Sequence, residues 1–117
     1  MKRVAIPISN NRLSEFFGEC EHYEIYEVDG KITGRKTVVV PGGINSTELP
    51  AWLGKYGVTD VITFKVNPKI IRYFVSRKVN LYVGIPTDLP ENLMKEYMLG
   101  RLESDERIIR ELINSEL

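Results

Sequence analysis

The chain has 117 residues, of which 43% are hydrophobic and 27% are charged, the size and composition of one ordinary globular domain. Its 16 basic residues balance 16 acidic residues, so it lacks the basic excess with which nucleic-acid-binding proteins neutralise phosphate. The single cysteine, Cys20, cannot build an internal disulfide framework. The apolar run near the N-terminus is interrupted by Pro7 and is too short for a signal peptide or a membrane span. We therefore expect one cytoplasmic domain with neither a nucleic-acid nor a membrane partner.

The first third of the chain predicts three β-strands. Residues 4–8 are apolar and are followed by a polar cluster, which is typical of a buried strand. Residues 22–28 alternate in polarity, and residues 31–40 are their expected partner strand. Asp29-Gly30 between these two segments is a strong hairpin signal, because glycine tolerates the positive φ that such turns need.

Helices and strands alternate in the rest of the chain. Apolar residues recur at helical spacing in residues 49–56, and residues 58–64 and 79–84 predict the fourth and fifth strands. The remaining helices are expected after Asn67-Pro68, after Pro90 and after Ser104-Asp105-Glu106, where proline or capping residues precede an apolar stripe.

This order of elements predicts an α/β fold of the ribonuclease H-like type. We expect a five-stranded mixed sheet in the order 3-2-1-4-5, with strand 2 antiparallel and helices on both faces. Residues 1–102 would form the domain, and residues 103–117 would form an extra amphipathic helix. That helix packs either on its own domain or on a neighbouring chain.

Two short segments are candidates for chemistry, and the sequence has no glycine-rich nucleotide-binding fingerprint. Gly42-Gly43 precede a predicted helix, whose free N–H groups would favour an anion; an ordinary turn is the simpler interpretation. Cys20 and His22 would point the same way on an extended chain. They could act as nucleophile and base or bind a soft metal, although an incidental thiol and a surface histidine are the simpler interpretation.

Residues 14–23, Ser-Glu-Phe-Phe-Gly-Glu-Cys-Glu-His-Tyr, resemble the Ser-Glu-His-Phe-Gly-Arg-(small)-x-x-Phe signature of dinitrogenase iron–molybdenum cofactor biosynthesis proteins. Residues 56–62 are similar to the Lys-Gly-Val-Asp-Val-Val-Ile segment of that family. Residues 67–69 and 79–84 are similar to its Gly-Pro-Arg and Gly-Ile-x-Val-Tyr-x-Gly segments. The resemblance covers residues 2–102, in order and with compatible spacing.

The resemblance implies a ribonuclease H-like fold and a protein that binds or carries iron–molybdenum cofactor, its precursor or a related cluster. The histidine of the signature is replaced by Phe16 here, and the stretch similar to a second, His-Gly-Ala-Gly segment, residues 42–45, also lacks histidine. Phenylalanine has no lone pair for a metal. The usual ligands are therefore missing, which points to a degenerate site, with Cys20 and His22 as the nearby substitutes.

We expect a non-enzymatic accessory or carrier protein, a monomer or weak homodimer that binds a metal cluster or a small anionic ligand. The cluster would be iron–molybdenum cofactor or an iron–sulfur cluster. The alternatives are a regulatory or protein-interaction domain that uses the last helix, and a small enzyme that uses Cys20 and His22. The candidate ligand-binding residues lie in three loops expected at one end of the sheet: Arg12, Ser14, Gly18, Cys20, Gly42, Gly43, Lys65 and Asn67, with Cys20 and His22 as candidate metal ligands.

Overall fold

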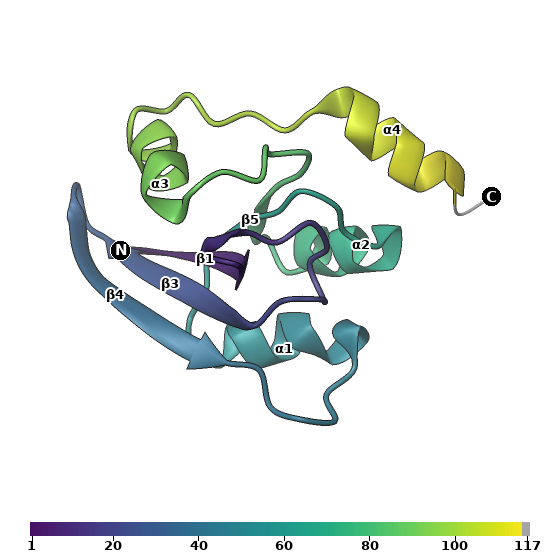
Figure 1. Ribbon diagram of the computed structural model, residues 1–117, viewed down its shortest axis with the longest axis horizontal. Helices are drawn as coiled ribbons and strands as arrows, with labels where there is room; N and C mark the ends of the chain where they lie inside the picture. Colours follow the sequence, from purple (N-terminus) through teal and green to yellow (C-terminus); the bar gives the residue numbers. More distant parts are fainter. Residues whose placement is uncertain (116–117) are drawn as a thin grey trace.

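The structure is a mixed α/β fold with helices on both faces of one sheet (Figure 1). It is a computed structural model that describes residues 1–115; the last two positions of the helix expected over residues 103–117 lie outside the described residues. The elements, in chain order, are β1 Lys2–Ser9, β2 Arg12–Leu13, β3 His22–Val28, β4 Ile32–Val39, the 3-10 helix η1 Ser46–Glu48, α1 Leu49–Gly54, β5 Asp60–Ile62, α2 Pro68–Ser76, β6 Asn80–Tyr82, α3 Pro90–Met98 and α4 Glu106–Ser115.

The sheet has six strands, one more than the sequence predicts. Its main path runs β4-β3-β1-β5-β6, and the short β2 pairs with β1 off this path. β3 is antiparallel to both of its neighbours, whereas β1, β5 and β6 are parallel. The five main strands lie in the order that the sequence predicts. The ribonuclease H-like assignment stays a prediction.

The extra strand, β2, exists because the chain turns back sharply after β1. Asn10 and Asn11 both adopt positive φ, 52° and 64°, and Ser9 pairs with Arg12 across the turn. Asparagine tolerates this left-handed backbone better than most residues, and two such residues make the tight turn typical of hairpins. In the sequence, this Asn-Asn pair indicates only the end of a strand, so the hairpin was not predicted.

Alternating side chains of the strands build two hydrophobic cores, one on each face of the sheet. In Figure 1, α1 lies below the strands and α3 above them. The larger core, on the face of α1 and α2, includes Phe17, Tyr23, Trp52, Leu53, Ile70 and Phe74. The smaller core, on the face of α3, includes Val4, Ile6, Ile8, Tyr26, Ile62, Leu93 and Met94.

The C-terminal helix α4 packs on its own domain. The chain before it is attached to the end of β6, because the amide of Asp105 donates to the carbonyl of Val83 (2.7 Å) and the amide of Val83 donates to Ser104 Oγ (3.0 Å). The apolar stripe of α4 then contacts the larger core through Ile108, Ile109 and Leu112. No helix within residues 1–115 has the length and apolar character needed to cross a membrane.

Candidate functional site

The loop that follows β2 is fixed by a buried hydroxyl group. Ser14 is 4% exposed, and its Oγ lies 3.0 Å from the carbonyl oxygen of Phe16 and 2.7 Å from that of Glu19. The amide of Ser14 donates to the carbonyl of Pro7 at 2.8 Å, and that of Glu21 donates to Ile8 at 2.9 Å. These bonds hold a compact turn over the end of β1, so Ser14 shapes the loop.

This loop is joined to the loop after β5 by backbone pairing. Phe16 and Lys65 form an isolated parallel bridge: the amide of Phe17 donates to Lys65 (2.9 Å), and the amide of Lys65 donates to Glu15 (3.0 Å). Because β1 and β5 are neighbouring parallel strands, their carboxyl ends bring both loops to one end of the sheet. Such crevices are where open α/β folds place ligands.

Gly18 allows a third segment, the 3-10 helix η1, to approach this loop closely. A Cβ atom at Gly18 would lie 2.9 Å from Ser46 Cβ, closer than real Cβ atoms come, so Gly18 is needed for η1 to pack on the loop. Ser46 thereby becomes part of the site. Side chains from three separate loops and from α4 meet here.

Two adjoining hollows lie at this end of the sheet. The first, the Lys65 hollow, has a volume of about 510 Å³, within the usual range for small-molecule sites. Its lining residues are Phe16, Phe17, Gly18, Glu19, Ser46, Lys65, Val66, Asn67, Pro68, Ile70 and Leu112. The second, the Arg12 hollow, has a volume of about 440 Å³ and is lined by Ser9, Asn10, Arg12, Leu13, Ser14, Glu15, Phe16, Glu19, Phe64 and Thr87.

Lys65 is the basic residue among those that line the first hollow. Its Nζ lies 5.5 Å from the ring centre of Phe16 and 5.2 Å from that of Phe64, within the range of cation–π attraction. Its acidic partner is Glu15, whose Oε1 is 3.4 Å away. Both side chains of this pair reach solvent, and an exposed pair contributes at most about 1 kcal/mol. An incoming anion can therefore displace Glu15 at modest cost.

The structure brings some of the predicted binding residues together and leaves others apart. Gly18, Lys65 and Asn67 line the Lys65 hollow, whereas Arg12 and Ser14 line the Arg12 hollow. Asn67 also caps α2, because its Oδ1 accepts from the amide of Lys69 at 2.8 Å.

The glycine turn belongs to neither hollow. Gly42 and Gly43 are exposed and line neither of them. A Cβ atom at either position would have no neighbour within 4 Å. The first turn of the helix that follows carries the acidic Glu48, which would repel an anion. Gly42 and Gly43 therefore do not join the other two loops as expected. Ser46, three residues after Gly43, lines the Lys65 hollow instead.

Cys20 and His22 do not form the pair that their spacing suggests. Cys20 packs against the larger core, where its thiol contacts the hydroxyl of Tyr23, and burial raises its pKa. His22 faces the opposite side of the sheet, with Nε2 3.1 Å from Glu24 Oε1. The prediction assumed an extended chain through both residues, whereas β3 begins only at His22. A partly buried thiol with a raised pKa is a poor nucleophile and a poor metal ligand.

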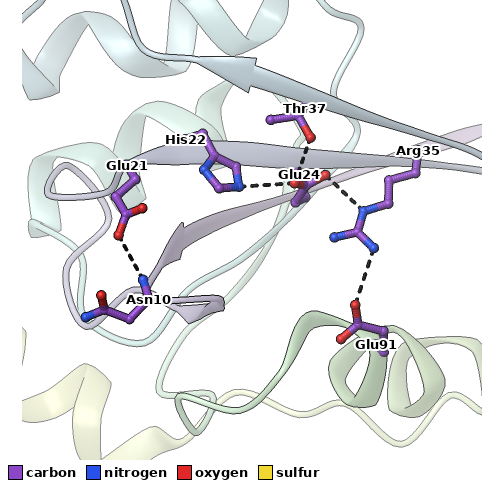
Figure 2. Close-up of polar contacts among 7 residues, drawn as sticks. All are labelled: Asn10, Glu21, His22, Glu24, Arg35, Thr37 and Glu91. Carbon is purple, nitrogen blue, oxygen red and sulfur yellow. Dashed lines mark hydrogen bonds and ion pairs between the residues drawn. The ribbon is translucent and has the colours of Figure 1, made fainter.

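His22 instead belongs to a polar network on the face of α3 (Figure 2). At its centre is Glu24, which is 4% exposed. Its carboxylate accepts from Thr37 Oγ1 (2.8 Å) and Arg35 Nε (3.0 Å), and Arg35 continues to Glu91 of α3 (3.3 Å). This network connects β3, β4 and α3 across the sheet face.

A coordinated metal does not fit the site. Within residues 1–115 there is no group of three or more His, Cys, Asp or Glu side chains that could hold a metal ion. Glu19 lines both hollows, but neither candidate metal ligand, Cys20 or His22, lines either of them.

Several lining residues were not predicted from the sequence. Glu15 and Glu19 lie within the predicted loop that begins near Arg12. Their positions in that loop could have identified them as lining residues. The sequence offers no comparable signal for Leu112, because the position of α4 depends on contacts distant in the chain.

Comparison with known proteins relates this chain to one family. The family model described as "Dinitrogenase iron-molybdenum cofactor" matches residues 1–100. An uncharacterized protein of Methanocaldococcus jannaschii, MJ0580, is 29% identical over 111 residues, which cover 91% of this chain and 93% of that protein.

Solved structures share the fold at lower identity. The crystal structure of PH0822 superposes with a TM-score of 0.79 at 24% identity, covering 88% of this chain and 94% of the other. The apo form of the orange protein from Desulfovibrio gigas superposes with a TM-score of 0.69 at 14% identity, covering 90% and 93% of the two chains. With the family match across residues 1–100, the chain belongs to the dinitrogenase iron–molybdenum cofactor family.

Proposed function

We propose that this chain is a non-enzymatic accessory or carrier protein that binds a small anionic cargo in the Lys65 hollow. The observation that carries the proposal is the hollow itself, about 510 Å³ at the carboxyl ends of β1 and β5, with one lysine, Lys65, among mostly apolar lining residues. Apolar walls with a few placed polar groups are typical of small-molecule sites. Membership of the iron–molybdenum cofactor family supports a cargo related to that cofactor.

The cargo must bring its own metal ligands if it contains metal. The residues described here offer no set of three donors, so a cluster would be held by charge, hydrogen bonds and shape. Lys65 would pair with its negative charge, and Ser46 and Asn67 would offer hydrogen bonds from the rim. An anion whose metal is already fully ligated matches these groups better than a bare metal ion.

Two carboxylates limit the affinity of the hollow for anions. Glu15 holds Lys65 in the exposed pair described above, and Glu19 is among the lining residues. A bound anion must displace Glu15 from Lys65 and is repelled by the negative charge of Glu19. Binding should therefore be moderate and should weaken as ionic strength rises, because salt screens the attraction. Reversible binding of this kind suits a protein that delivers its cargo elsewhere.

The test uses tetrathiomolybdate, a molybdenum–sulfur anion that carries all of its own ligands. Equilibrium dialysis with molybdenum analysis should show one site per chain. Lys65→Met should weaken binding about tenfold or more, since a hydrogen bond to a charged group contributes about 1.5–3 kcal/mol. Glu15→Gln should strengthen binding by removing the competing carboxylate.

The matched control is Lys31→Met, which removes the same charge in the turn between β3 and β4. It should bind tetrathiomolybdate like the parent protein. Equal affinities of the Lys65 and Lys31 variants would rule out the Lys65 hollow as the site. Cys20→Ala should also leave binding unchanged, because Cys20 packs against the larger core and lines neither hollow.

A further inference from the structure

The two hollows are separated by one aromatic side chain. Phe16 lines both the Lys65 hollow and the Arg12 hollow, and Glu19 is the other residue that they share. Phe16 therefore forms part of the wall between two spaces of about 510 Å³ and about 440 Å³.

This wall does not belong to the hydrophobic core. Phe16 is 43% exposed, whereas its neighbour Phe17 is 1% exposed and packs edge-on against Tyr23 and Phe74. The ring of Phe16 is held by Lys65, whose Nζ lies 5.5 Å from its centre. An exposed phenylalanine beside a hollow contributes little to folding, so its effect on the shape of the site can be measured separately.

Each hollow has its own cation. Lys65 lines one, and Arg12 lines the other. Arg12 is positioned by a hydrogen bond from its guanidinium to the carbonyl of Thr87 (3.4 Å). A ligand confined to the first hollow meets only Lys65, whereas a longer anion that crossed the wall would meet both cations. The wall thus decides whether the second charge contributes to binding.

We propose that Phe16 determines ligand size in this site, because its ring confines the anion to the Lys65 hollow and blocks access to Arg12. This proposal rests on the proposed function, since it assumes that Lys65 binds the anion. It assigns to Phe16 a steric role in specificity. The ligand class that follows is a compact anion that fits within one hollow.

The test compares anions of the same chemistry and different length, phosphate and tripolyphosphate. Binding is measured by calorimetry in the wild type, in Phe16→Ala, in Glu15→Gln and in the double variant that combines both substitutions. Glu15→Gln is included because the carboxylate of Glu15 lines the Arg12 hollow and would repel a long anion there.

The double variant should bind tripolyphosphate about tenfold more tightly than Glu15→Gln does, while phosphate affinity should differ by less than about twofold. Adding Arg12→Met should abolish the gain. Thermal unfolding should show that Phe16→Ala is folded, since substitutions of exposed residues usually change stability little.

Two results would overturn the role of Phe16. One is a tripolyphosphate affinity that does not rise when the ring is removed; the other is a gain that survives Arg12→Met. Either would leave the proposed function intact if Lys65→Met still weakened tetrathiomolybdate binding. If Lys65→Met had no effect on that anion, the proposed function itself would fail.

Discussion

Two buried tyrosines of β3 differ in what their hydroxyl groups contact. Tyr23 is fully buried in the larger core, and its hydroxyl donates to the carbonyl of Phe17 at 2.7 Å. Tyr26 is 4% exposed, and its hydroxyl has no hydrogen-bond partner among residues 1–115. Its ring lies under the guanidinium of Arg35, 5.2 Å from the ring centre. A buried hydroxyl without a partner costs desolvation free energy that nothing recovers.

Replacing each tyrosine with phenylalanine should therefore have opposite effects. Tyr26→Phe should leave the free energy of unfolding unchanged or raise it by up to about 1 kcal/mol, because it removes an unsatisfied group. Tyr23→Phe should lower it by about 1–2 kcal/mol, because the carbonyl of Phe17 loses its donor. Urea unfolding of the two variants measures both. A clear loss of stability in Tyr26→Phe would mean that the hydroxyl has a partner, such as a bound water.

Glu24 should make stability depend on pH in the acidic range. Burial alone would raise the pKa of Glu24, but hydrogen bonds from Arg35 and Thr37 hold it below the ordinary value of 4.5. The folded protein therefore keeps the carboxylate charged at a lower pH than the unfolded chain does. The resulting stabilisation is fully present above about pH 4.5 and is lost as pH falls through the lowered pKa.

The variant Glu24→Gln isolates this contribution because its amide does not titrate. Between about pH 5 and about pH 3, the unfolding free energy of the wild type should fall more steeply than that of Glu24→Gln. Denaturant unfolding at a series of pH values measures both slopes. Parallel slopes would show that Glu24 has the same pKa in the folded and unfolded states.

At the scale of single residues, the sequence predicts the environment of a side chain only where the local backbone is regular. Within β3, alternation places Tyr23 and Ile25 on one face and His22 and Glu24 on the other. Cys20 lies just before the strand, so alternation does not apply, and its thiol turns to the face of Tyr23. The same irregularity explains why a Cys-x-His spacing was misleading.

At the scale of elements, the packing of α4 on the domain depends on one glycine. Gly84 follows β6 with a φ of +81°, and a Cβ atom there would lie 2.6 Å from Asp105 Cβ and 3.1 Å from Ile108 Cβ. Gly100, between α3 and α4, has a similar φ of +69° and no neighbour within 4 Å of such a Cβ atom. The two glycines share the same backbone requirement and differ in their surroundings.

Alanine at these two positions should therefore separate backbone strain from packing. Gly100→Ala should cost about 1–2 kcal/mol, the cost of a left-handed backbone for an L-residue. Gly84→Ala should cost more and should also release α4, because its Cβ atom would displace Asp105 and Ile108. Hydrogen exchange should then show faster exchange in residues 106–115 of Gly84→Ala only. Equal protection of α4 in both variants would contradict this anchoring.

Elements with a strong local pattern were the ones the sequence predicted well. Alternation, the Asp29-Gly30 turn and the Pro-opened helices α2 and α3 were all visible in short windows. β2 has two residues, too few to show any period, and the docking of α4 comes from contacts between distant segments. The candidate site follows the same division: the loops that carry Arg12 and Lys65 were predicted, whereas the places of Ser46 and Leu112 in the lining were not.

For the whole molecule, the central sheet separates two cores, and their contributions to the free energy of unfolding should be independent of each other. Ile6 of β1 lies in the smaller core and Ile70 of α2 in the larger one, and both are almost fully buried. Ile6 and Ile62 share the smaller core and directly follow the paired residues Ala5 and Val61 on neighbouring strands. One pair therefore lies on opposite faces of the sheet, and the other lies side by side.

Double-mutant cycles with isoleucine-to-valine substitutions test this separation. Each single substitution should lower the unfolding free energy by about 1 kcal/mol, the usual cost of one buried methyl group. Ile6→Val and Ile70→Val should add to within about 0.5 kcal/mol, because they share no contacts, whereas Ile6→Val and Ile62→Val should deviate more, because a common cavity can relax. Coupling across the sheet as large as coupling within one core would show that the two faces are packed as a single unit. The loops at the end of β1 would then be sensitive to changes on either face, and the hollows could not be altered independently of the core.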